Sequence, residues 1–465
     1  MTMKHYGGIQ VINTSSGMHS SSFKAGMFLL ETLTAGMYNN PLSIYREYIQ
    51  NAADSIDLHK NIQDPETLKI EIHLDPHGQS VTIRDNGAGI PGNIAENILS
   101  SIGSSSKTGT DARGFRGIGR LGGIAFSDKA IFRTKASCDN FESIQEWDCK
   151  KLRLQLTNPQ KTSLSLNEVF QEVTKFERIN SKKTSDSYFE VKLEGVYSFR
   201  NSILDIAKVR EYLSQVAPVP FNPQAFSYHK EIDSYLENNL RRYGRYNIIL
   251  NGDPVFKPYQ DRVRLTKKAY DQIDGVDCFD LKICDTTIAN CWIGKRRELS
   301  GGIAKGDHSS GIRVRIGNIL LGDAHFLDRC FREARFNSYC IGEIHVECPD
   351  LIPNSRRDDY VDNEMKTLFF NAVEKRIGFP LSKEIRYRSR LASNAHKERE
   401  SKCIENKCAD SNFNTSPEVS KNSFEQSVPY DSTIREIKNA FNTMCLDCPN
   451  KNELLRLLNL GSSTS

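Results

Sequence analysis

The sequence lacks long apolar runs and has no marked excess of charge of either sign. No window reaches the roughly eighteen consecutive apolar residues expected of a membrane span, and residues 1–26 lack the apolar core of a secretion signal. The 62 basic residues nearly balance the 58 acidic ones, so the composition gives no strong reason to expect a polyanionic partner. These absences argue against a membrane or secreted protein and predict a cytoplasmic one.

Two familiar phosphate-binding signatures are also missing. No Gly-x-x-x-x-Gly-Lys-Ser/Thr element occurs, which excludes a P-loop NTPase. Gly117-Ile-Gly-Arg-Leu-Gly122 matches the letters of the dinucleotide-binding fingerprint, but a polar loop precedes it where that fingerprint requires a strand. We therefore reject a dinucleotide-binding βαβ unit at this position.

The cysteines do not indicate a disulfide framework. Twelve cysteines in 465 residues, without a secretion signal, are typical of reduced thiols. Four of them lie near the end of the chain and could together offer thiolates to zinc: Cys403, Cys408, Cys445 and Cys448. Only the last two have a familiar metal spacing, and a polar tail often carries unligated cysteines, so zinc binding is the less favoured interpretation.

Apolar patterns predict two α/β domains. Apolar residues at three- and four-residue steps predict a helix over residues 42–57, and alternation predicts a β-hairpin over residues 68–85. Further strands are predicted at residues 130–134, 147–156, 188–193, 246–250, 281–283 and 311–321. A helix over residues 203–216 is followed by a proline cluster, which marks a break between domains.

The expected organisation therefore has four parts, and a polar insertion at residues 158–187 interrupts the first of them. They are a first domain at residues 1–216 with a mobile lid at 92–123, a second α/β domain at 217–387, a flexible linker at 388–432 and a short helical tail at 433–465.

The first candidate functional motif lies in the predicted helix over residues 42–57. Glu47, Asn51 and Asp54 are four and three residues apart, which places their side chains on one helix face. Taken alone, such a polar stripe is usually a solvated face.

The second motif, Asp85-Asn-Gly-Ala-Gly89, directly follows a predicted strand. Gly87 and Gly89 would let the backbone turn sharply and approach a ligand closely. A carboxylate fixed at Asp85 can accept a hydrogen bond from an exocyclic amine such as that of adenine. Taken alone, the motif is more often an ordinary turn.

The third motif is a glycine cluster that follows a Ser/Gly-rich segment. Its members are Gly114, Gly117, Gly119, Gly122 and Gly123. Exposed amides at the start of a helix bind phosphate oxygens, and glycine removes the side chains that would block them. The cluster is therefore a candidate phosphate cradle.

In this order and at these separations, the three motifs resemble those of the gyrase, heat-shock chaperone, histidine kinase and MutL (GHKL) ATPases. The resemblance covers about residues 20–200 directly. It implies a two-layer α/β sandwich of the Bergerat type that binds ATP, followed by an α/β second domain of the transducer or middle type.

The resemblance also implies roles for the motif residues. Glu47 would activate the attacking water, Asn51 would hold magnesium, and Asp85 would bind adenine. Asp54 would contact the nucleotide through water or brace its helix. The segment 98–113 would be the ATP lid, which offers Ser105 and Lys107 to the phosphates.

One segment of the predicted second domain points to a branch of the superfamily. Asp350-Leu-Ile-Pro-Asn-Ser-Arg-Arg-Asp358 resembles part of the middle domain of the ninety-kilodalton heat-shock (HtpG-like) chaperones, in which an arginine reaches the γ-phosphate. Arg357 fits that position best, Arg356 is the other candidate, and a solvated arginine pair is the alternative. Since a polar linker and a short helical tail follow the second domain, we expect no chaperone-type dimerisation domain, which argues against a full chaperone assignment.

These observations predict a magnesium-dependent ATPase switch that resembles the heat-shock chaperones, pairs through its N-terminal domain and acts on an unidentified protein client. Histidine kinases commonly have Asn or His in place of Glu47, so hydrolysis is favoured over transfer to a histidine. One alternative is a MutL- or MORC-like nucleic-acid clamp, and another is an ATP sensor or scaffold that does not hydrolyse. The clamp would use basic clusters at residues 241–245, at 295–297 and at Arg313 with Arg315.

Overall fold

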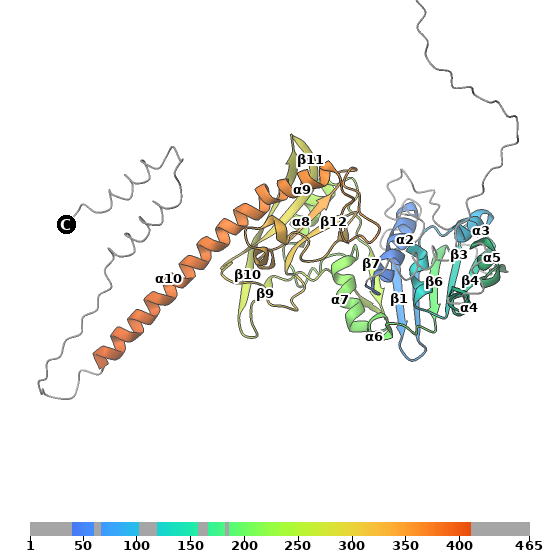
Figure 1. The fold of residues 1–465 in the computed structure, drawn as a ribbon, viewed down its shortest axis with the longest axis horizontal. Coiled ribbons are helices and arrows are strands. Elements are labelled where there is room, and N and C mark those ends of the chain that lie inside the picture. Colours follow the sequence, from blue (N-terminus) through green and yellow to red (C-terminus); the bar gives the residue numbers. More distant parts are fainter. Residues whose placement is uncertain (1–39, 60–66, 102–118, 157–165, 182–185, 411–465) are drawn as a thin grey trace, which may run out of the picture. The chain divides into compact units, whose positions relative to one another are not determined.

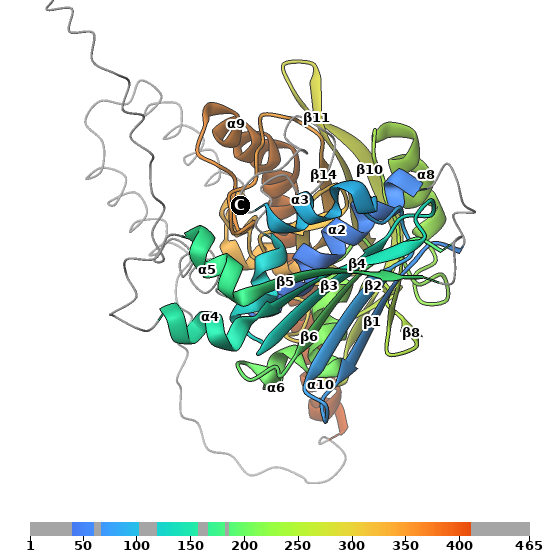
Figure 2. The ribbon, with the colours of Figure 1, turned by 90° about the vertical axis from the view of Figure 1, so that its right-hand side faces the viewer.

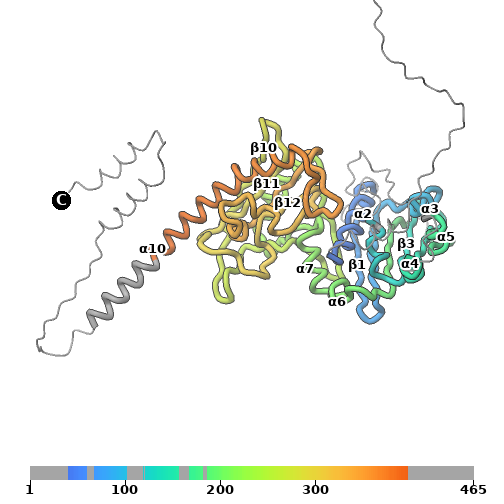
Figure 3. Tube along the Cα trace, viewed as in Figure 1, coloured from blue at the N-terminus to red at the C-terminus, as the bar shows by residue number. Residues whose placement is uncertain are grey.

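The computed structural model describes residues 40–59, 67–101, 119–156, 166–181 and 186–410. The chain divides into two units, residues 1–396 and 397–465, and the first holds all the elements below except the end of the last helix. Figures 1 and 3 trace the path of the chain from α2 to α10.

The first part of the chain folds as a mixed sheet with helices packed on it. The strand order is β5-β4-β3-β6-β2-β1-β7-β8, antiparallel except between β1 and β7. The strands are β1 (Lys69–Asp75), β2 (Ser80–Asp85), β3 (Lys129–Lys135), β4 (Phe141–Asp148), β5 (Thr174–Asn180), β6 (Tyr188–Glu194), β7 (Asn247–Leu250) and β8 (Asp253–Pro254). The helices are α2 (Ser43–His59), α3 (Gly92–Ser100), the 3-10 helix η2 (Gly119–Ala125), α4 (Cys149–Leu156), α5 (Leu166–Val173), α6 (Arg200–Ile203) and α7 (Ile206–Val216).

Helix α2 lies against the middle of this sheet. It contacts β1, β2 and β6, while α3 contacts β3 and β4 (Figure 2). Alternate residues of β1, among them Ile70 and Ile72, are buried under α2 side chains such as Ile49. Because a strand presents alternate residues to one face, this pattern makes a two-layer sandwich, which confirms the fold class implied by the sequence.

A second sheet follows, with strand order β13-β12-β14-β11-β10-β9 and a parallel pair between β12 and β14. Its strands are β9 (Arg262–Arg264), β10 (Tyr270–Ile283), β11 (Thr286–Arg296), β12 (Gly311–Ile316), β13 (Ile319–Leu321) and β14 (Ile341–Val346). Its helices are α8 (His229–Asn239), the 3-10 helices η4 (Asp328–Cys330) and η5 (Ala334–Tyr339), α9 (Glu364–Val373), the π-helical turn η6 (Glu374–Gly378) and α10 (Phe379–Asp410). None of the helices in these ranges is both long and apolar enough to cross a bilayer.

Most of the predicted elements are confirmed, but the strand predicted at residues 147–156 is wrong. Strand β4 ends at Asp148, and the rest of the segment is helix α4. Leu152, Leu154 and Leu156 alternate as in a strand, which explains the error. In the helix, Leu152 is buried and Leu154 is 65% exposed, since only one side of α4 packs on the domain.

Two further expectations differ from the structure. The predicted polar insertion at residues 158–187 contains α5 and the edge strand β5, which pairs with β4. The predicted linker begins as helix, because α10 continues to Asp410 through a sequence of good helix formers without glycine or proline after Pro380. The rest of the linker and the tail lie outside the described residues.

The predicted domain boundary between residues 216 and 217 remains a prediction. Strand β7 follows this boundary in sequence but pairs in parallel with β1, with Ile70 opposite Ile248. After the proline-rich segment, helix α8 packs on β10 and β11 of the second sheet, and the chain then returns to the first sheet with β7 and β8 before it forms the strands of the second.

Candidate functional site

The turn after β2 is packed tightly against α2. The Gly87 amide donates to the Asp85 carboxylate at 3.0 Å, and the Ala88 amide donates to the backbone oxygen of Ser55 on α2 at 3.1 Å. A Cβ added at Gly87 would lie 2.5 Å from the Ser55 backbone. Gly89 has φ +66°, and a Cβ there would lie 2.0 Å from the Lys135 backbone oxygen. Both glycines are therefore required by close approach, and Gly89 also by its backbone conformation.

Asp85 is a buried carboxyl group with neutral close neighbours. It is 2% exposed, and burial raises its pKa to about 7, against the opposing effects of the Ser55 hydroxyl and the Gly87 amide. A buried carboxyl group is usually paired with a cation, so this arrangement is typical of a ligand-binding position rather than a structural one. An amine donor from a bound base would supply the missing partner.

Helix α2 presents a narrow stripe of partly exposed side chains. Glu47, Asn51 and Ser55, at four-residue spacing, are partly exposed, whereas most of the helix is buried. Asp54, by contrast, is 4% exposed and pairs with Arg242 at 3.4 Å. The structure thus favours the bracing role for Asp54 and adds Ser55 to the stripe, a residue that the sequence analysis missed.

The start of the glycine-rich helix lies beside Glu47. A Cβ added at Gly119 would lie 2.6 Å from Glu47 Oε2, and the Gly123 amide donates to the Tyr48 hydroxyl at 3.0 Å. Two of the three predicted motifs, the α2 stripe and the glycine cluster, are therefore in contact. The Asp85 turn meets α2 at Ser55, so the helix joins all three.

Other site residues had no recognisable sequence pattern. Ser187, just before β6, is buried and its hydroxyl donates to the Gly87 backbone oxygen at 2.7 Å. Thr134 in β3 is fully buried, and its hydroxyl accepts from the Ile90 amide at 2.8 Å. A single hydroxyl residue in a strand carries no periodic pattern, and only the strand register brings these two to the turn.

Several predicted positions cannot be placed. Ser105, Lys107, Gly114 and Gly117, and with them most of the predicted lid, lie outside the described residues, as do Cys445 and Cys448. Cys403 and Cys408 fall within α10, but their side chains are not described. Among the side chains that are described, no group of three or more His, Cys, Asp or Glu could hold a metal ion.

The loop that carries Arg356 and Arg357 approaches the helix of Glu47. Arg46 Nη2 donates to the Arg356 backbone oxygen at 3.0 Å, and Arg46 Nε lies 3.4 Å from Glu47 Oε1. Arg357 has φ 55° and its backbone oxygen accepts from the Gly322 amide at 2.9 Å. The loop is thus fixed from both sides, and one residue, Arg46, contacts both Glu47 and the loop.

The predicted nucleic-acid patch at Arg313 and Arg315 is wrong. Arg313 is 2% exposed and Arg315 is fully buried, because β12 lies between β13 and β14 with both faces covered. In the other clusters Arg296 is buried with Asp271, and Arg245 pairs with Asp233. The Arg296 and Arg245 side chains are thus occupied by carboxylates of the chain itself.

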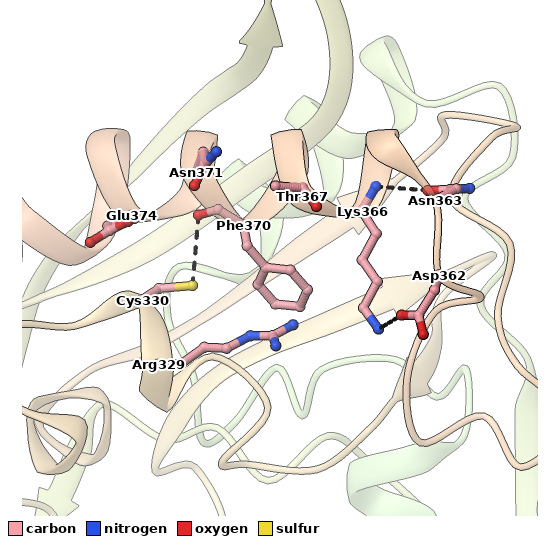
Figure 4. Close-up of a pocket in the computed structure, with 9 residues that line it drawn as sticks. All are labelled: Arg329, Cys330, Asp362, Asn363, Lys366, Thr367, Phe370, Asn371 and Glu374. Carbon is pink, nitrogen blue, oxygen red and sulfur yellow. Dashed lines mark hydrogen bonds and ion pairs between the residues drawn. The ribbon is translucent and has the colours of Figure 1, made fainter.

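A separate hollow of about 570 Å³ lies on the second sheet's helical side (Figure 4). Lys366 points across it to Asp362, and the Arg329 guanidinium stacks on the Phe370 ring at 3.3 Å from its centre. Lys366 is neutralised by its carboxylate partners, and Glu374 adds an acidic group to the lining. The hollow has none of the glycine turns that distinguish the α2 site.

Comparison with known proteins agrees with this geometry. Residues 44–179 match the family described as "Histidine kinase-, DNA gyrase B-, and HSP90-like ATPase". The chain is similar to the chaperone protein HtpG of Mycolicibacterium vanbaalenii (33% identical over 90 residues, 18% of this chain and 13% of that protein). It is also similar to HtpG of Buchnera aphidicola (32% over 130 residues, 23% and 20%) and of Coxiella burnetii (27% over 148 residues, 26% and 22%).

The matched part contains the α2 stripe, the Asp85 turn and Gly119, and it spans less than a quarter of the length of these chaperones. The fold and the site thus agree with the family match. Residues 44–179 of the chain match the ATP-binding domain of the GHKL ATPases, and HtpG chaperones are among the proteins to which the chain is similar.

Proposed function

We propose that this protein is a magnesium-dependent ATPase whose nucleotide state changes the arrangement of its two sheets. The observation that supports this best is the buried Asp85 carboxyl group in a glycine turn packed on the helix of Glu47 and Asn51. The turn offers an acceptor for the adenine amine. Helix α2, on which the turn packs at Ser55, also carries the Glu47 carboxylate and the Asn51 amide. The residues therefore fit one elongated ligand with a base at one end and phosphates at the other.

Each residue has a chemical task in this proposal. Glu47 orients and deprotonates the attacking water, since a partly exposed carboxylate can accept its proton. The Asn51 amide oxygen would hold magnesium, which when bound neutralises phosphate charge. The backbone around Gly119 lies against Glu47 without an intervening side chain, so phosphate oxygens can approach both.

The second sheet would supply the cation. The loop of Arg356 and Arg357 lies against Arg46, next to the proposed base, and an arginine that reaches the γ-phosphate stabilises charge in the transition state. We propose Arg357 for this role. The contact of Arg46 with Glu47 would be exchanged for contacts with the nucleotide as the site closes.

The HtpG relatives support two further proposals, namely pairing of two ATP-bound protomers through the first domain and action on a protein client. Light scattering with and without a non-hydrolysable ATP analogue tests the pairing. A mass that does not rise with the analogue contradicts it. We do not propose the nucleic-acid clamp, because Arg313 and Arg315, two of the basic residues that it would use, are buried.

Steady-state phosphate release from ATP and magnesium tests the central proposal. We expect turnover in the wild type, loss of most turnover with ATP binding retained in Glu47→Ala, and weakened ATP binding in Asp85→Asn. The loss for Glu47→Ala should be about 100-fold or more, which is usual for a general base. Normal hydrolysis by Glu47→Ala contradicts the assignment of the base. ATP binding without turnover in the wild type identifies the sensor alternative.

A further inference from the structure

A fully buried cluster of charged residues lies in the second sheet, away from the proposed ATP site. The Glu343 carboxylate on β14 accepts from Lys257 Nζ at 2.7 Å and from Arg315 Nε, and His345 Nε2 lies 3.0 Å away. The side chains of Lys257, Arg315 and Glu343 are all 0% exposed. Buried ions on this scale do not by themselves stabilise a fold, because removing each from water carries a large penalty.

The buried groups of the cluster shift one another's pKa. Burial and the neighbouring Arg315 lower the pKa of Lys257 to about 7. Burial alone would raise the pKa of Glu343, yet Arg315 and Lys257 hold it well below its ordinary value. Lys257 and Arg315 thus share the Glu343 carboxylate, while burial and Arg315 shift Lys257 toward its neutral amine.

The cluster also binds two segments that lead back to the first sheet. Arg315 Nη2 donates to the backbone oxygen of Gln215, at the end of α7, at 2.9 Å. Lys257 Nζ donates to Asn318 Oδ1 at 3.0 Å, and Asn318 Nδ2 donates to the Gly244 backbone oxygen at 2.8 Å. The charged side chains therefore fix backbone groups outside their own sheet.

Residues 242–246, called here the coupling segment, contact α2 on either side of Gly244. Arg242 Nε donates to Asp57 Oδ2 at 3.0 Å, and the Tyr246 hydroxyl contacts the same carboxylate at 2.7 Å. Arg242 also pairs with Asp54, as described above. One backbone oxygen of this short segment is held by the second sheet, while the residues around it hold the helix that carries Glu47.

We propose that Asn318, anchored by the buried Lys257–Glu343–Arg315 cluster, is a positioning residue that couples the nucleotide-site helix α2 to the second sheet through the coupling segment. Helix α2 is then attached at Arg46 to the Arg356 loop and at its other end to residues 242–246. A rigid second attachment fixes the distance between Glu47 and that loop. The inference rests on the proposed ATPase function and specifies how the second sheet responds to it.

Asn318→Asp is the sharpest test. Asn318 has φ 61°, a conformation that Asp also tolerates, and the new carboxylate keeps an acceptor for Lys257. The donor to the Gly244 oxygen is replaced by an oxygen, which the Gly244 carbonyl oxygen repels, so this contact is broken. We expect kcat to fall about threefold to tenfold, the range of one net hydrogen bond, with the Kd for ATP changed less than twofold.

Asp271→Asn is the matched control. Asp271 and Arg296 form another buried pair in the second sheet, with side chains 1% and 0% exposed. Their hydrogen bonds reach Leu299, Gly301 and Tyr339, which lie in the segments around that sheet. This variant removes a buried charge of the same kind without touching the coupling segment. We expect Asp271→Asn to lower the free energy of unfolding but to keep kcat close to the wild-type value.

Hydrogen exchange provides a readout that does not need hydrolysis. We expect ATP binding, measured separately by calorimetry, to protect backbone amides of β12 and β13 in the wild type and in Asp271→Asn, but not in Asn318→Asp or Arg242→Met. ATP binding without turnover refutes the proposed hydrolysis but leaves this exchange test intact. The inference is overturned if ATP binds and β12 and β13 do not respond, if Asn318→Asp behaves as wild type, or if Asp271→Asn loses the response equally.

Discussion

Replacing Asp85 by Asn should weaken ATP binding and at the same time stabilise the protein without nucleotide at alkaline pH. In the proposed function the two effects have opposite signs, because ATP binding uses the Asp85 carboxylate while its burial destabilises the fold. Its nearest partners, Ser55 and the Gly87 amide, are neutral and can be satisfied by an amide side chain as well. Only the ligand's amine donor requires the carboxylate.

The pKa gives the magnitude. The pKa of Asp85 rises from 3.8 to about 7 on folding, which corresponds to about 4 kcal/mol between the two protonation states. Between these pH values the folded protein retains a proton that the unfolded chain has released, so stability is greatest below pH 3.8 and falls as pH rises to about 7. Roughly 3 kcal/mol of this loss lies between pH 5 and 8. Asp85→Asn should not show this loss of stability, because its amide side chain does not ionise.

Denaturant unfolding of both proteins at pH 5 and pH 8, without nucleotide, measures this difference. We expect the free energy of unfolding of the wild type to fall relative to that of Asp85→Asn as the pH rises. Asp54→Asn is the control, since it makes the same change in a buried carboxylate that Arg242 already pairs, and it should destabilise the protein. An Asp85→Asn variant that is less stable than wild type at pH 8 refutes the reasoning.

Calorimetric titration with ATP completes this test. A hydrogen bond to a charged group contributes about 1.5–3 kcal/mol, so the variant should bind about 10- to 100-fold more weakly at pH 8. Wild-type affinity should rise from pH 5 to 7 as Asp85 ionises. The pH dependence of ATP affinity in Asp85→Asn reflects the titration of the ATP phosphates and of other protein groups. Only the difference in pH dependence between wild type and variant is therefore assigned to Asp85.

Two other predictions concern the turn and the second-sheet loop. Gly89→Ala should lower the free energy of unfolding by about 2 kcal/mol or more, because its Cβ would meet the Lys135 oxygen. Gly252 also has a positive φ but has open space around it, so Gly252→Ala should lower this free energy less. Equal losses in chemical denaturation would show that the close approach at Gly89 is unimportant. Arg357→Ala should lower kcat about 100-fold or more with ATP binding intact, whereas Arg356→Ala should not; the reverse result in phosphate-release assays would transfer the role to Arg356.

The sequence alone determined the elements whose pattern is local. Helix α2 was predictable because its apolar residues recur at helical steps, and the hairpin of β1 and β2 because apolar residues alternate. The Asp85 turn was predictable from its glycines, since only glycine permits those approaches. Local patterns of this kind depend little on distant contacts, and together with the glycine cluster they carried the resemblance to the GHKL ATPases.

Tertiary structure alone decided which side chains face the site. Asp54 and Ser55 are neighbours on one helix, and the sequence could not show that Asp54 turns to Arg242 while Ser55 lies under the glycine turn. Arg313 and Arg315 look like surface residues until both faces of β12 are covered. Exposure depends on what other elements cover, and contacts between residues far apart in sequence carry no local periodicity from which they could be predicted.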